Sequence, residues 1–109
     1  MTVGELLDCG AFKSLSLPHP ERSIDGVYIG DLLSWVMGRA ECDNAWITIM
    51  SNVNVIAVAT LVDTSCVILA EGVIVDEDVL NTAKEKEVNI LSTELSAYEA
   101  ALKLAGMTL

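Results

Sequence analysis

The sequence predicts an α/β protein, a single domain in which βα repeats build a mostly parallel sheet flanked by helices. From residue 26 onward, four short apolar runs alternate with longer helical segments, an order typical of βαβ units with right-handed crossovers. Hydrophobic residues make up 52% of the chain and aromatic residues only 5%, so aliphatic side chains fill the core, as in buried parallel strands. The length of 109 residues fits one domain, and we expect residues 1–109 to form it.

The first quarter of the chain is expected to hold one short helix and one strand. Thr2 and Glu5 have the spacing of a capping box, which predicts a helix from about residue 3 to residue 9. Leu15 and Leu17 then alternate with serines, which predicts a strand. Pro18 ends this strand, because proline cannot donate a ladder hydrogen bond. A loop should follow to about residue 25.

Four βα units are expected in the rest of the chain. The pattern predicts strands at 27–29, 46–50, 66–70 and 88–91, and helices at 31–37, 52–61, 76–86 and 94–104. Two glycines bracket the first of these strands. We expect Gly26 to turn the chain into the strand and Gly30 to turn it out again. Asp31 is then expected to cap the helix that follows.

Two of these helices carry more apolar surface than one side of a sheet can cover. The helix at 52–61 is apolar all round, and the helix at 31–37 is nearly so. Such helices are buried on more than one side. Either a second subunit, most commonly in a twofold homodimer, or a third layer within the monomer covers the other side. The candidate dimer-interface residues are Leu33, Trp35, Val36, Val55, Val58 and Ala59.

Polar residues follow the predicted strands at their carboxyl ends. In open α/β sheets this rim is where ligands bind, because loops converge there and helix N-termini present free amides. The same residue types are also the preferred N-caps of helices. The rim residues therefore either line a ligand pocket or only cap helices. The candidates are Asp31, Ser51, Asn52, Asn54, Ser92 and Thr93.

The charge of the chain argues against two classes of partner. Sixteen Asp and Glu against six Lys and Arg give a formal net charge of −10, which would repel nucleic acid and anionic membranes. The longest apolar stretch, residues 53–62, is far shorter than the ~20 residues of a membrane helix. The N-terminus is acidic, unlike a signal peptide. We expect a cytoplasmic protein that binds neither nucleic acid nor membrane.

The sequence contains no pattern that predicts catalysis or metal binding. It lacks the phosphate-loop, dinucleotide-binding, zinc-protease and serine-hydrolase motifs. His19 lies between two prolines and is expected to be solvated. Cys9, Cys42 and Cys66 form no C-x-x-C pair, so structural thiols are favoured over a metal or disulfide role. We therefore expect no catalytic residue, no cofactor and no metal.

Residues 21–37, ERSIDGVYIGDLLSWVM, resemble the signature of the DRTGG domain family, commonly written D-R-x-I-T-G-G-Y-x-S-D-L-L-S-x-V-M. We call four of these positions the signature loop: Arg22, Gly26, Tyr28 and Gly30. The departures are Glu21, Asp25, Val27 and Gly30. Further similar stretches lie at 46–49, 54–59 and 91–99, so the resemblance spans nearly the whole chain.

The resemblance implies a regulatory or accessory domain without catalytic activity of its own. Such domains lie between nucleotide-sensing modules of an inorganic pyrophosphatase, and they resemble the N-terminal domain of HPr kinase/phosphorylase. Together with the apolar helices, this predicts a homodimer that mediates regulatory contacts with a protein partner. The alternative is a sensor that binds a nucleotide or metabolite at the carboxyl rim of the strands. An enzyme is the least favoured of the three, and the missing phosphate loop gives a kinase label no support.

Overall fold

The protein contains one mixed five-stranded sheet, described here from a computed structural model covering residues 1–108. The strands are β1 (Lys13–Ser16), β2 (Gly26–Ile29), β3 (Asn44–Thr48), β4 (Cys66–Leu69) and β5 (Ile90–Ser92). Their order across the sheet is β1-β5-β4-β3-β2. Strands β2 to β5 are parallel to their neighbours, and β1 pairs antiparallel with β5. The prediction of a mostly parallel α/β sheet is confirmed.

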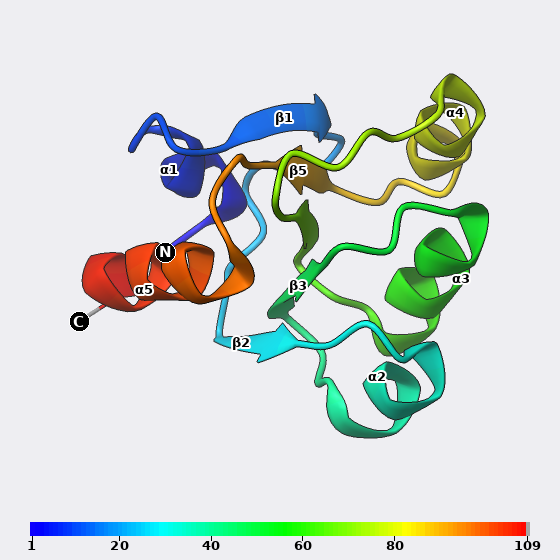
Figure 1. The fold of residues 1–109 in the computed structure, drawn as a ribbon, viewed down its shortest axis with the longest axis horizontal. Helices are drawn as coiled ribbons and strands as arrows, with labels where there is room; N and C mark the ends of the chain where they lie inside the picture. The colour runs from blue at the N-terminus through cyan, green and yellow to red at the C-terminus, as the bar shows by residue number, and fades with distance from the viewer. Residues whose placement is uncertain (109) are drawn as a thin grey trace.

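Helices cover both faces of this sheet and give the molecule three layers (Figure 1). They are α1 (Val3–Leu7), α2 (Leu33–Arg39), α3 (Val53–Val62), α4 (Glu77–Glu85) and α5 (Ala97–Thr108). Figure 1 shows α2, α3 and α4 side by side along one face, with α1 and α5 on the other. Within residues 1–108 no helix combines the length and apolarity needed to cross a membrane.

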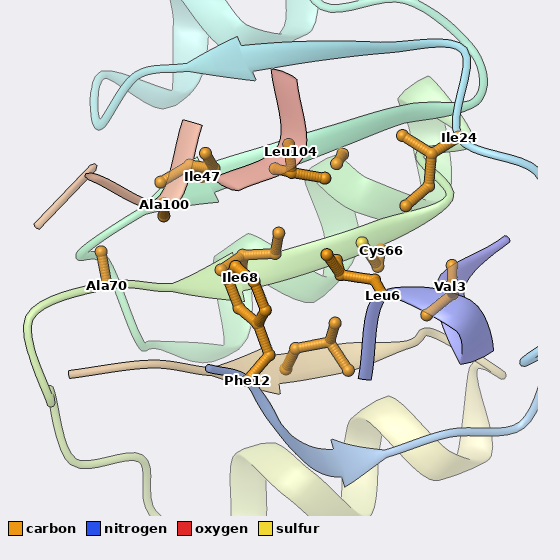
Figure 2. Close-up of a cluster of buried hydrophobic side chains, with 12 residues drawn as sticks. Val3, Leu6, Phe12, Ile24, Ile47, Cys66, Ile68, Ala70, Ala100 and Leu104 are labelled. Carbon is orange, nitrogen blue, oxygen red and sulfur yellow. The ribbon is translucent and has the colours of Figure 1, made fainter. Parts of the chain in front are cut away.

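Two hydrophobic cores result, one on each face of the sheet, because successive strand side chains point to opposite sides. On β3, Ile47 belongs to the core beneath α1 and α5, whereas Trp46 belongs to the core beneath α2, α3 and α4. Figure 2 shows the first core, which brings together Leu6 from α1, Phe12 and Ile68 of β4. Burial on both faces explains the aliphatic character of the strands.

The first helix begins as predicted and ends earlier. Thr2 Oγ1 accepts a hydrogen bond from the Glu5 amide at 3.1 Å, and Glu5 Oε1 accepts one from the Thr2 amide at 3.0 Å. This reciprocal pair is the predicted capping box. The helix stops at Leu7, and Gly10 follows with a φ of 79°. A left-handed residue of this kind is incompatible with a continuing helix.

The first strand departs from the simple alternation of leucine and serine. Ser16 is buried, and its hydroxyl donates to the Val88 carbonyl at 2.9 Å, while Leu15 is only partly buried. The pairing of β1 with β5 shifts register between Ser14 and Ser16. An irregularity of this kind changes which side chains face the core.

The start of α2 corrects the predicted role of Asp31. The N-cap position is Leu32, whose side chain has no oxygen to cap the helix. Asp31 Oδ1 instead accepts hydrogen bonds from Thr48 Oγ1 at 2.8 Å and from the Ile49 amide at 3.0 Å. The carboxylate therefore ties the connection after β2 to the end of β3. The prediction that Asp31 caps the helix is wrong.

The position of α3 accounts for its apolar surface. This helix packs against α2 on one side and α4 on the other, with the sheet beneath it. Four of the six candidate dimer-interface residues are buried in this chain's own core, which corrects their assignment to a subunit surface. They are Val36, Val55, Val58 and Ala59. Thus α2 and α4 of the same layer cover the flanks of α3, for which the sequence analysis considered a second subunit or a third layer.

Candidate functional site

Arg22 of the signature loop is held between two aspartates near the amino ends of the parallel strands. Its guanidinium donates to Asp43 Oδ1 and Asp63 Oδ1, both at 2.8 Å, and to the Asp63 carbonyl at 2.6 Å. Both aspartates have a φ of 66°, Asp43 just before β3 and Asp63 at the end of α3. Hydrogen bonds from Arg22 lower the pKa of Asp63. Arg22 therefore fixes two left-handed turns.

The two signature-loop glycines provide space for neighbouring side chains. Neither has a positive φ. A Cβ on Gly30 would lie 2.8 Å from Cε2 of the Tyr28 ring, and a Cβ on Gly26 would lie 3.0 Å from Nδ2 of Asn44. Trp46 Nε1 also donates to the Gly30 carbonyl at 2.9 Å. The two glycines therefore do not turn the chain as we expected. They allow side chains of β2 and β3 to pack closely against the backbone.

The three cysteines are free thiols, and the single histidine contacts two glutamates. Cys66 is buried in the core, and this burial raises its pKa to about 12. Cys9 and Cys42 are exposed. His19 lies between two glutamates, at 3.3 Å from Glu21 and 3.4 Å from Glu87. In the part of the chain that the structure describes, no three His, Cys, Asp or Glu residues are placed to hold a metal ion.

The candidate rim residues fall into two groups separated by β4. Asp31, Ser51, Asn52 and Asn54 follow β2 and β3, whereas Ser92 and Thr93 lie at the end of β5. In the first group Asn52 Oδ1 accepts from the Asn54 amide at 2.9 Å and caps α3. Asn52 therefore has a structural role as a helix cap, and Asp31 has one in joining the segment after β2 to the end of β3.

In the second group the Thr93 hydroxyl has a structural hydrogen bond, whereas the Ser92 hydroxyl has no partner within residues 1–108. The buried Thr93 hydroxyl donates to the Ala11 carbonyl at 2.8 Å. Ser92 is partly buried and lines a pocket of about 330 Å³. The pocket residues are Gly10, Ala11, Lys13, Gly72, Val73, Ser92, Thr93, Glu94 and Leu95.

The rim candidates drawn from the sequence do not include two charged residues of this pocket, Lys13 and Glu94. Lys13 enters it because β1 pairs antiparallel with β5 and places Lys13 directly opposite Ser92. That pairing joins residues far apart in the chain, so no local pattern predicts it. Glu94 follows the predicted strand at 88–91, and this position is the signal that the sequence offered for it.

A second surface feature is a set of exposed apolar residues at the start of and within α2 and in α3, which we call the neutral face. Trp35 is 55% exposed, and the Arg39 guanidinium stacks on its ring at 4.1 Å. The sequence between residues 44 and 62 contains no charged residue. The exposed apolar residues of the neutral face are Leu32, Trp35, Met37, Val53 and Leu61.

Comparisons with known proteins agree with this architecture. A family model described as the DRTGG domain matches residues 24–107. A solved structure with a similar fold is that of the CBS and DRTGG domains of the regulatory region of Clostridium perfringens pyrophosphatase, complexed with the activator diadenosine tetraphosphate. The TM-score is 0.74 at 12% identity, and the match covers 94% of this chain and 45% of that chain. No curated protein gives a significant match. Since the family model spans most of the chain, the protein belongs to the DRTGG domain family.

Proposed function

We propose that this chain is a non-catalytic regulatory module that forms a twofold homodimer through its neutral face and acts in contact with a protein partner. The observation that carries the proposal is this exposed apolar surface on two adjacent helices. Large exposed apolar patches on soluble domains mark interaction sites. The similar solved structure belongs to the regulatory region of a larger enzyme, which supports the regulatory part. We treat residues 1–109 as one functional unit.

The distribution of charge favours a second copy as one occupant of the neutral face. The chain carries a formal net charge of −10, yet α3 contains no charged residue and the only charge on α2 is Arg39. Two acidic molecules repel each other unless they meet through surfaces without carboxylates. A twofold contact places the same patch on both subunits. The neutral face satisfies this condition, because its apolar residues meet their own counterparts across the axis.

Light scattering coupled to gel filtration at micromolar concentration tests the dimer. The wild type should elute with twice the monomer mass of 11.7 kDa. Trp35→Glu should give the monomer mass, because it places two carboxylates in a desolvated contact. Tyr98→Glu is the matched control, since Tyr98 is an exposed aromatic on α5, in the opposite helix layer. A wild type that remains monomeric would refute the homodimer. A dimer that survives Trp35→Glu would refute the neutral face as its interface.

A second candidate function is a small-molecule sensor. The observation that favours it is the pocket beside Ser92, which lies at the carboxyl ends of the strands where α/β proteins bind ligands. A thermal-shift screen of nucleotides and central metabolites tests this function. A hit lost in Ser92→Ala would assign the ligand to this pocket, and a hit lost in Asn54→Ala would assign it to the start of α3. The absence of any hit would contradict the sensor.

A further inference from the structure

We infer that the pocket beside Ser92 binds a small zwitterion of the amino-acid type. Its carboxylate would lie against Lys13 and Ser92, and its ammonium group against Glu94. This inference rests on the proposed sensor function and names the chemical class of its ligand. The location, the polar groups and the size of the pocket support it independently.

The location is the point where the connections after two neighbouring strands diverge. After β4 the chain passes to α4, in the layer with α2 and α3, whereas after β5 it passes to α5 on the opposite face (Figure 1). Strands β2 and β3 also lead to helices of the first layer. Divergence of this kind opens a crevice between adjacent loops, and open α/β sheets bind ligands in such crevices. The pocket lies between these two loops and includes Gly72 and Val73 from one and Glu94 and Leu95 from the other.

The Lys13 cation and the Ser92 hydroxyl lie side by side in the pocket. Lys13 and Ser92 are directly opposite each other in the antiparallel pair. Their side chains therefore point to the same face of the sheet, with Cβ atoms about 5 Å apart. Lys13 forms no ion pair and the Ser92 hydroxyl forms no hydrogen bond with other residues in the described range. An ammonium group and a hydroxyl that remain available are suitable donors to a carboxylate.

An acidic group, Glu94, also lines the pocket. The Glu94 carboxylate lies close to Gly72, and a Cβ on residue 72 would collide with Glu94 Oε2. Gly72 also has a φ of 64°, a conformation that side chains with a Cβ rarely adopt. Glycine at this position therefore allows both the turn after β4 and the approach of Glu94. Within residues 1–108 Glu94 has no cationic partner, so its charge is available to a ligand's ammonium group.

Size and charge select a small neutral molecule over a nucleotide. A volume of about 330 Å³ is at the lower limit of small-molecule pockets, which span about 300–1,000 Å³. A pocket lined by a single lysine and a glutamate cannot neutralise a polyphosphate, and the net charge of −10 repels polyanions from the whole surface. A zwitterion has no net charge and can satisfy both groups. Ala11, Val73 and Leu95 provide apolar lining for a short aliphatic side chain.

Amide chemical-shift titration of the full chain tests the inference with defined probes. The probes are glycine, alanine, valine and leucine as zwitterions, propionate and propylamine as half-ligands, and ATP as a polyanion. At least one amino acid should give saturable shifts at Gly72, Ser92 and Thr93. Each half-ligand should bind at least tenfold more weakly, because it satisfies only one of the two charges.

Charge-removing variants test the two poles of the pocket. Lys13→Met and Glu94→Gln should each weaken binding at least tenfold, whereas Lys103→Met and Glu41→Gln, which remove surface charges elsewhere, should leave it unchanged. Amino-acid shifts that survive both pocket variants would overturn the assignment. Saturable shifts with ATP and none with amino acids would refute the ligand class while sensing stands. If no probe shifts any amide, the inference is refuted, and the thermal-shift screen of nucleotides and central metabolites decides the sensor function separately.

Discussion

Replacing Arg22 by methionine should cost this fold about 2–3 kcal/mol of unfolding free energy. The Arg22 side chain is 26% exposed and joins the turn before β3 to the end of α3 through Asp43 and Asp63. A hydrogen bond to a charged group contributes about 1.5–3 kcal/mol when it is shielded from water. The Asp43 and Asp63 side chains are 36% and 62% exposed, so solvent screening reduces each pair to about 1 kcal/mol. The lost bond to the Asp63 carbonyl adds about 1 kcal/mol.

Urea unfolding, followed by far-UV circular dichroism, measures this loss. Arg22→Lys should fall between the wild type and Arg22→Met, because an ammonium group keeps the charge and loses the forked geometry. Arg39→Met is the control, since Arg39 makes an exposed stack on Trp35 that contributes about 0.5–1 kcal/mol. If the unfolding free energy of Arg22→Met lies within about 0.5 kcal/mol of the wild-type value, the range of ordinary surface substitutions, the stabilising role of Arg22 is refuted.

Hydrogen bonding by Arg22 lowers the pKa of Asp63, so its stabilising effect is present above the unfolded pKa and is lost as pH falls through the folded value; acid unfolding of Arg22→Met should show a smaller loss across that window than the wild type. Gly30→Ala places a Cβ 2.8 Å from the Tyr28 ring and should destabilise the fold by about 1–3 kcal/mol in urea, with partial recovery in the double variant Gly30→Ala, Tyr28→Leu. Thr64→Val should raise the unfolding free energy by up to about 1 kcal/mol, because the buried Thr64 hydroxyl has no partner within residues 1–108; a decrease would contradict this. Burial and a pKa of about 12 should keep Cys66 unreactive toward a disulfide reagent until the protein unfolds. The exposed Cys9 and Cys42 should react at once. Rapid reaction of all three thiols in the folded protein would refute this prediction.

Several elements could be predicted because their causes are local. The Thr2 and Glu5 capping box depends on residues three positions apart, and the structure forms it as expected. The aliphatic runs predicted β3, β4 and β5, since strands buried on both faces carry continuous apolar side chains. Asp31 shows the limit of local reasoning. Its position before a helix suggests a cap, yet its carboxylate binds the end of a neighbouring strand. The two donors, the Thr48 hydroxyl and the Ile49 amide, come within reach of Asp31 only when β2 and β3 pair.

The sequence by itself determined the α/β class, the parallel order of the βα units, the family and the acidic surface. Only the tertiary structure decided which surfaces and pockets exist. Packing of α3 between α2 and α4 buries residues such as Val55 and Val58 that had been assigned to an interface. Pairing of β1 with β5 brings Lys13 opposite Ser92, and Arg22 joins Asp43 to Asp63 across distant segments. Periodicity reports how each segment is buried, whereas contacts between distant segments depend on how all the elements pack together.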